Sequence, residues 1–160
     1  MKSFLMKPRN LLIYVAALCI GFLAYAVYLQ HFKGVDTCPL CVLQRYAFTA
    51  IAIFCLLGAM ANVPRFSAFL GTIAALSGAG VATYQLWLRT QPGISCGYDA
   101  LETVVNSLLT AKWLPFLFYG EGSCTNDNFQ LFGLSAPQWA LLWFVAFAIA
   151  LVWTMFRRTK

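Results

Sequence analysis

Long, nearly uninterrupted apolar stretches dominate the chain and set its predicted architecture. Four of these stretches are long enough to cross a bilayer, whose hydrocarbon core takes about 20 helical residues. They cover approximately residues 11–29, 42–61, 66–88 and 137–156. The pattern therefore predicts an all-α integral membrane protein, a four-transmembrane-helix bundle that forms one domain over residues 1–160.

Composition supports a membrane protein and excludes an ordinary soluble domain. The chain is 61% hydrophobic and 10% charged, with a mean hydropathy of +0.74, whereas soluble domains have about 25% charged residues. The net charge of +6 could suggest a nucleic-acid partner. The basic residues flank the apolar stretches instead, so we expect a lipid partner and no nucleic acid.

The distribution of charge also predicts the orientation in the membrane. The N-terminal segment, the connection at residues 62–65 and the C-terminal segment contain basic but no acidic residues, whereas all five acidic residues fall in the loops at about 30–41 and 89–136. Because cytoplasmic segments are enriched in Lys and Arg, both termini are expected in the cytoplasm. The two acidic loops then face outward. The basic residues concerned are Lys2, Lys7, Arg9, Arg65, Arg157, Arg158 and Lys160.

The six cysteines divide into two groups by position. Cys19 and Cys55 lie in the middle of apolar stretches, where a thiol behaves as a small buried apolar group. Cys38, Cys41, Cys96 and Cys124 lie in the outward loops, and outward thiols imply an oxidising compartment in which disulfides persist. Spacing alone leaves two interpretations of these four: structural disulfides that staple the loops, or redox-active pairs.

The context of the first pair favours redox chemistry. Residues 36–39, Asp-Thr-Cys-Pro, predict a helix start with Cys38 near the N-cap and Pro39 at the first helical position. The positive end of a helix dipole favours a thiolate. Cys38, Cys41 and Arg45 share one stripe of this helix. A guanidinium there can stabilise a thiolate or the anionic form of a bound acceptor, although an arginine near the end of a span can also snorkel to the headgroups.

The second outward loop contains both remaining cysteines and an apolar segment between them. Turn residues precede Cys96, and a glycine-rich run precedes Cys124, so both are expected in mobile surroundings. Between them, apolar residues recur at helical spacing and are followed by the aromatic run 113–119. This segment is too short to span and predicts a short amphipathic helix on the membrane surface. The spaced residues are Leu101, Val104, Val105, Leu108 and Leu109.

Taken in order, the motifs resemble the disulfide bond formation protein B (DsbB) family of bacterial quinone-dependent thiol oxidases. The matching stretches are CPLCVLQR at 38–45, CG at 96–97, GSC at 122–124 and FGLSAPQW at 132–139. The CxxC motif alone is weakly specific, but the ordered set is strongly specific, and the resemblance covers nearly the whole chain.

The resemblance implies a defined electron route. A periplasmic thioredoxin-fold dithiol oxidase of the DsbA type would attack a Cys96–Cys124 disulfide and form a mixed disulfide with Cys96. Cys124 would exchange with Cys38, and Cys41 would pass electrons to a quinone (ubiquinone or menaquinone) bound near Arg45. The same resemblance implies a multi-pass protein of the bacterial inner membrane that draws on the quinone pool, with its cysteine loops in the periplasm.

Histidine is scarce where some members of this family use it. Some relatives carry a histidine near the end of the third span that is linked to the quinone site, but the stretch 82–87 has none. His31, the only histidine, is interpreted as an interfacial polar residue. No metal site is expected, because no acidic or histidine ligands accompany the thiols within the spans.

Three alternatives remain at this stage, and one of them, a metal-binding or transport role for the four thiols, lacks the acidic or histidine ligands within the spans. A vitamin K epoxide reductase-like enzyme also joins quinones to disulfides, but its CxxC follows its loop cysteines, whereas here the CxxC comes first. A non-enzymatic tetraspan scaffold would use the loop disulfides as staples and would not explain Arg45 on the cysteine stripe. Loss of single outward cysteines separates the alternatives, since a relay stops at each one and a scaffold only weakens.

Overall fold

The four predicted spans are helices in the structure. The computed structural model describes residues 7–34, 37–91, 98–120, 130–131 and 133–157. Within these residues, four helices are long and apolar enough to cross a membrane, which confirms the all-α four-span prediction. They are α2 (Pro8–Phe32), α3 (Pro39–Met60), α4 (Pro64–Arg89) and α8 (Ala136–Phe156).

A proline in the first turn marks the start of each long helix. Proline is favoured there because the amide that it lacks has no partner within the helix in any case. In α8, the amide of Ser135 also donates to Gln138 Oε1 at 2.8 Å, which satisfies the N-cap. Such local signals explain why the apolar stretches located the helices to within a few residues. The prolines are Pro8, Pro39, Pro64 and Pro137.

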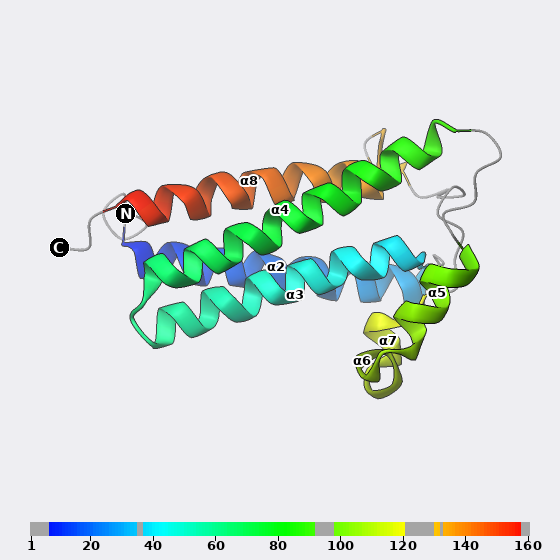
Figure 1. Ribbon diagram of the computed structural model, residues 1–160, viewed down its shortest axis with the longest axis horizontal. Helices are drawn as coiled ribbons and strands as arrows, with labels where there is room; N and C mark the ends of the chain where they lie inside the picture. Colours follow the sequence, from blue (N-terminus) through cyan, green and yellow to red (C-terminus); the bar gives the residue numbers. More distant parts are fainter. Residues whose placement is uncertain (1–6, 35–36, 92–97, 121–129, 132, 158–160) are drawn as a thin grey trace.

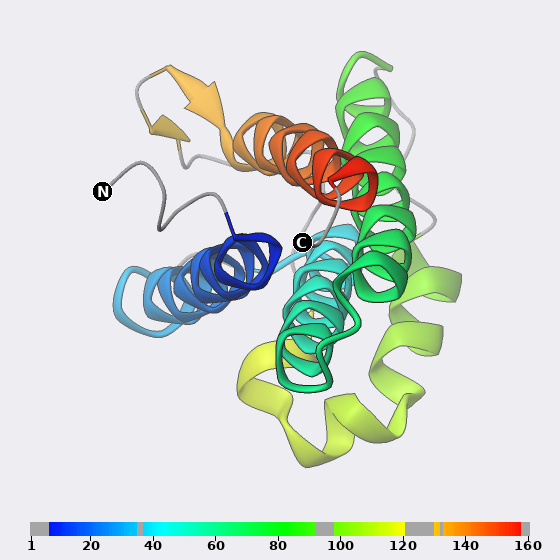
Figure 2. The same ribbon diagram turned by 90° about the vertical axis from the view of Figure 1, so that its left-hand side faces the viewer.

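The long helices form a bundle in which α3 packs against α2 and α4, and α4 packs against α8 (Figures 1 and 2). All four contribute to one apolar core, while many large apolar side chains point outward, as expected of a lipid-facing surface. Cys19 and Cys55 are fully buried in this core, which confirms their interpretation as apolar groups. Core residues include Leu12, Val15, Phe48, Ile51, Ala75, Phe144 and Leu151.

Glycine allows α4 to approach its neighbours closely. A Cβ atom added at Gly78 would lie 2.5 Å from ring carbons of Phe144 in α8 and 2.9 Å from the Cβ atom of Ala47 in α3. Small residues at such crossings are typical of membrane helices, whose association depends on close packing. Gly78 therefore sets the spacing of three helices.

Among residues 98–120, the described part of the second loop, the structure has three short helices where the sequence predicted one. They are α5 (Tyr98–Ser107), α6 (Leu109–Trp113) and α7 (Pro115–Phe118). The interruptions fall at Leu108 and Leu114, whose ψ angles of 142° and 62° are not helical. The second break has a clear cause, because a residue that precedes proline is disfavoured in the α region.

These short helices turn one apolar side toward the bundle. Val105 is buried against Val42 of α3, whereas Val104 and Leu109 are exposed. Apolar side chains therefore lie on both the packed and the exposed side of these short helices. Their position at a membrane surface stays a prediction.

A small antiparallel hairpin, which the apolar pattern did not predict, leads into α8. Strand β1 (Gln130–Leu131) pairs with β2 (Leu134–Ser135), with Gln130 opposite Ser135. Gly133 has a φ angle of 79°, a left-handed conformation that glycine adopts readily.

Candidate redox site

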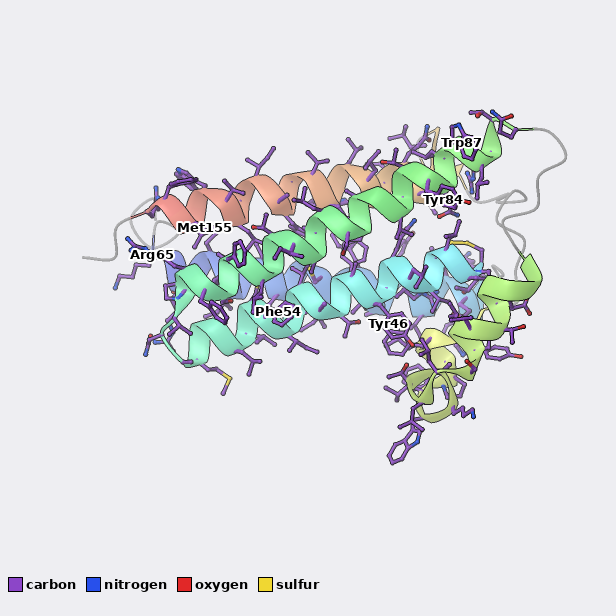
Figure 3. The ribbon with its side chains drawn as sticks, viewed as in Figure 1. Tyr46, Phe54, Arg65, Tyr84, Trp87 and Met155 are labelled. Atoms are coloured by element: carbon purple, nitrogen blue, oxygen red, sulfur yellow. A yellow bond between two sulfur atoms is a disulfide. The ribbon has the colours of Figure 1, made fainter. Side chains whose placement is uncertain are left out.

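Cys38 and Cys41 form a disulfide at the start of α3, with 5.1 Å between their Cα atoms. Figure 3 shows it at the end of the bundle near α5. Cys38 is the N-cap residue, Pro39 follows it in the first turn, and the amide of Cys41 donates to Cys38 Sγ at 3.1 Å. The predicted helix start is therefore confirmed. Cys38 is only 1% exposed.

A glutamine from the neighbouring helix donates to both sulfur atoms. The side chain of Gln85 in α4 is fully buried, and its Nε2 lies 3.3 Å from Cys38 Sγ and 3.4 Å from Cys41 Sγ. Its Oε1 accepts a hydrogen bond of 2.8 Å from Gln44 Nε2. The network orients the Gln85 amide with its N–H groups on the disulfide, and these can stabilise negative charge on sulfur when the pair is reduced.

Sequence reasoning missed both glutamines. A signal existed, because a polar side chain inside an apolar helix needs a polar partner or a function. The two residues lie 41 positions apart, and nothing in the linear pattern indicates that they meet beside the cysteines.

Arg45 is buried rather than extended to the headgroups. It is 8% exposed, and one terminal nitrogen donates to Gln30 Oε1 and to the carbonyl of Leu117, both at 2.8 Å. The other donates to Thr37 Oγ1 at 3.1 Å. Arg45 thus joins α2, α3 and α7 one turn inside the cysteine pair. Its predicted role, to stabilise a thiolate or the anionic form of a bound acceptor, stays a prediction.

Tyr46 attaches the short helices to α3. Its ring stacks on Phe118 of α7, with 4.3 Å between the ring centroids, and its hydroxyl bonds to the Thr110 hydroxyl of α6 (Figure 3). Together with the Arg45–Leu117 contact, this fixes the second loop beside the start of α3.

Immediately after α7, the chain lies against the backbone of Cys38. Asn106 of α5 binds both polar backbone groups of Gly120: its Nδ2 donates to the carbonyl at 3.1 Å, and its Oδ1 accepts from the amide at 3.2 Å. A Cβ atom added at Gly120 would lie 2.9 Å from the carbonyl oxygen of Thr37 and 3.3 Å from the carbonyl carbon of Cys38. Glycine is therefore required for this close approach.

The other residues that the sequence singles out are the two cysteines of the second outward loop and the single histidine. Cys96 and Cys124 lie outside the described residues, so their predicted pairing stays a prediction. His31 is exposed, and its Nδ1 donates to the Val27 carbonyl one turn earlier in α2 at 3.1 Å, in accord with its interpretation as a surface polar residue. Across the described part of the chain, no three His, Cys, Asp or Glu side chains gather closely enough to hold a metal ion.

Comparisons with known proteins agree with this architecture. Residues 8–154 match the family described as "Disulfide bond formation protein DsbB". A "Disulfide bond formation protein B" from Herminiimonas arsenicoxydans is 47% identical over 95% of this chain and 98% of its own length. Proteins with the same description from Ralstonia nicotianae and Cupriavidus necator are 43% and 42% identical, each over 96% of this chain and over 98% and 96% of their own lengths.

Proposed function

Because the chain belongs to the DsbB family, a family of disulfide bond formation proteins, we propose that it is a membrane thiol:quinone oxidoreductase. It reoxidises a periplasmic dithiol oxidase of the DsbA type and passes the electrons to ubiquinone or menaquinone. The observation that carries the proposal is the buried Cys38–Cys41 disulfide at a helix N-terminus, with the Gln85 amide on both sulfurs. These donors suit a pair that is repeatedly reduced and reoxidised.

The sulfur steps are two successive exchanges that move one electron pair. The reduced partner dithiol attacks Cys96 of a Cys96–Cys124 disulfide and leaves as a disulfide, so that both loop cysteines become reduced. Cys124 then attacks Cys38 and releases Cys41 as a thiolate. Attack of Cys96 on Cys124 restores the loop disulfide and leaves Cys38 reduced. The electron pair and two protons now reside on Cys38 and Cys41.

Arg45 and its surroundings fit a quinone carbonyl. A guanidinium has five N–H donors, and three of those of Arg45 have acceptors among the described residues. The other two can donate to a quinone carbonyl oxygen. A bound quinone supplies an acceptor for two electrons and two protons, which restores the Cys38–Cys41 disulfide.

Reduction potentials explain why the pair needs such surroundings. Structural disulfides lie below about −300 mV, whereas a DsbA-type partner lies near −120 mV. A staple-like disulfide would therefore oxidise this partner against about 180 mV, or roughly 8 kcal/mol. Hydrogen-bond donors that stabilise the reduced form raise the potential, and coupling to quinone reduction draws the exchange forward.

The proposed location is the bacterial inner membrane, with the cysteine loops in the periplasm. Support comes from the four span-length helices and from the acid-free basic segments at one end of the bundle. A DsbA-type partner meets the cysteines only on that side.

Quinone reduction by the purified full-length protein, driven by a reduced DsbA-type partner, tests the relay. We expect turnover in the unmodified protein and its loss, by at least about 100-fold, in Cys41→Ser and Cys96→Ser, because each variant removes one sulfur from the exchange sequence. Cys19→Ala is the matched control. It removes a buried core thiol and should leave turnover largely unchanged.

Retention of turnover in either relay variant would contradict the proposed route. A small dithiol in place of the partner separates two kinds of failure. Turnover with the small dithiol but not with the DsbA-type protein would mean that the partner is wrong. No turnover with either reductant, in folded protein supplied with quinone, would favour structural disulfides.

A further inference from the structure

We propose that Asn106 and Gly120 form an anchor that holds the chain leading to Cys124 against Cys38, and so positions Cys124 for exchange. The inference rests on the proposed function, because it explains how the loop pair reaches the membrane pair. Neither residue touches a reacting sulfur in the described structure, so both are positioning residues. The anchor consists of the two Asn106–Gly120 hydrogen bonds and the contact of Gly120 with Thr37 and Cys38.

The hydrogen bonds of the anchor fix a backbone position, not merely a side chain. The Asn106 amide uses both its donor and its acceptor on Gly120, so it fixes the position and the direction of the peptide backbone there. Asn106 itself belongs to α5, where neighbouring Val105 is buried against α3. Through this chain of contacts, the rigid start of α3 determines where the loop passes.

Burial of Cys38 makes an internal carrier necessary. Cys38 is 1% exposed, and Gly120, itself buried, is one of the residues that cover it. Thiol–disulfide exchange requires the attacking sulfur to reach the sulfur under attack. An external protein is kept from Cys38, whereas a sulfur carried by the covering segment is not.

The chain segment between Gly120 and Cys124, here called the tether, is short. Cys124 follows Gly120 by four residues, which span at most about 14 Å when fully extended. If the anchor is lost, the nearest fixed residue before Cys124 is Tyr119, whose amide donates to the Pro115 carbonyl at 3.1 Å and which precedes Cys124 by five residues. The anchor therefore places the last fixed backbone position before Cys124 next to Cys38 and four residues from Cys124.

The test is the effective concentration of Cys124 at Cys38, measured in the full chain with Cys41→Ser and Cys96→Ser. In a glutathione buffer, the Cys38 and Cys124 thiols react with oxidised glutathione to give the intramolecular Cys38–Cys124 disulfide and two reduced glutathiones. Alkylation traps the equilibrium mixture and gives the ratio of disulfide to dithiol protein. We expect Asn106→Ala to lower the effective concentration by about 1.4-fold or more, since it falls as roughly the −3/2 power of the length of chain between the last fixed residue and Cys124, or more steeply. Gly120→Ala should lower it at least as much, because the added carbon displaces the backbone from Thr37.

Ser107→Ala is the matched control. Ser107 neighbours Asn106, but its hydroxyl donates only locally, to the Val104 carbonyl at 2.8 Å, so the ratio should not change. An unchanged ratio in Asn106→Ala, an equal fall in Ser107→Ala, or no Cys38–Cys124 disulfide with the anchor intact would each overturn the proposal. Should Gly120→Ala fail to fold, Asn106→Ala alone decides.

The measurement uses neither quinone nor a partner protein. A protein that shows the anchored disulfide but no quinone turnover would overturn the proposed function and keep the anchor. Quinone turnover, combined with a ratio that Asn106→Ala leaves unchanged, would overturn the anchor and keep the proposed function.

Discussion

At the scale of single residues, the most consequential contact is that of Gln85 with the disulfide. Its buried amide lies within 3.4 Å of both sulfur atoms, and Gln44 fixes its orientation. In the disulfide form, these N–H groups face weak acceptors. In the reduced form, they face a thiolate or a thiol, and a hydrogen bond to a charged group contributes about 1.5–3 kcal/mol. Gln85 therefore favours the reduced pair.

Gln85→Leu should make the Cys38–Cys41 reduction potential more negative by about 30–60 mV, the equivalent of one lost charge-assisted bond. The potential is measured by redox titration of protein in which Cys96 and Cys124 are replaced by serine. Thr83→Ala, which changes an exposed residue of the same helix, should leave the potential unchanged. A potential that is equal in Gln85→Leu and the unmodified pair would refute the role of the amide.

The sequence predicted part of this site and not the rest, for a physical reason. Local signals near the first cysteine, chiefly Pro39, were enough to predict the N-cap position of Cys38. The burial of Arg45 among Gln30, Thr37 and Leu117 depends on three segments distant in the chain, so spacing on one helix could not reveal its partners. Contacts within one turn are encoded locally, whereas contacts between helices require the packed bundle.

At the scale of elements, two nearby glycines of α4 have opposite surroundings. Gly78 faces Phe144, whose ring stacks on Phe48 with 4.2 Å between centroids, so the ring cannot yield easily. Gly80 has no atom within 4 Å of its would-be Cβ. Gly78 therefore determines how closely α3, α4 and α8 pack, whereas Gly80 does not.

Gly78→Ala should lower the free energy of unfolding by about 1–3 kcal/mol, the cost of inserting a carbon into a packed core. Gly80→Ala should be neutral, or stabilising by up to about 1 kcal/mol, through the higher helix propensity of alanine. Denaturation in mixed micelles, followed by helical circular dichroism, measures both. Equal losses in the two variants would show that Gly78 does not control the packing.

Element boundaries also show what periodicity can and cannot predict. The long helices follow from apolar length and from prolines at their starts. The second loop was expected to hold one amphipathic helix, but the backbone leaves the helical region at Leu108 and Leu114. Pro115 gives a sequence reason for the second break. Asn106 and Ser107, directly before the first break, have side chains that compete with helical hydrogen bonds, although neither fixes the position of the break as a proline does.

At the scale of the whole molecule, the two ends of the bundle differ in chemistry. Figure 3 shows Arg65 at one end, and Tyr84 and Trp87 toward the other, where the disulfide lies. Arg65 donates to the carbonyl of Arg157 at 3.4 Å, and the Arg157 guanidinium lies 3.8 Å from the centre of the Trp153 ring. Arginine and tryptophan together are typical of a membrane interface. Charge predicts that this end is cytoplasmic, and the orientation stays a prediction.

A fluorescent protein fused after Lys160 should therefore be bright in bacterial cells, and alkaline phosphatase fused there should be inactive, since that enzyme needs periplasmic disulfides. The same phosphatase inserted after Gly93, in the second outward loop, should be active. An active C-terminal phosphatase fusion would invert the proposed orientation and place the cysteine pair in the cytoplasm.

The burial of Cys19 and Cys55 has a consequence for the fidelity of thiol pairing. Cys55 follows Cys41 by 14 residues in the same helix, a rise of about 21 Å, and both core thiols are sealed among apolar side chains. A member of a family of disulfide bond formation proteins thus carries two thiols that the proposed exchange chemistry cannot reach. The depth of these two thiols in the bundle therefore gives the exchange its selectivity. Mispairing with Cys19 or Cys55 is prevented by their location, whatever their intrinsic reactivity.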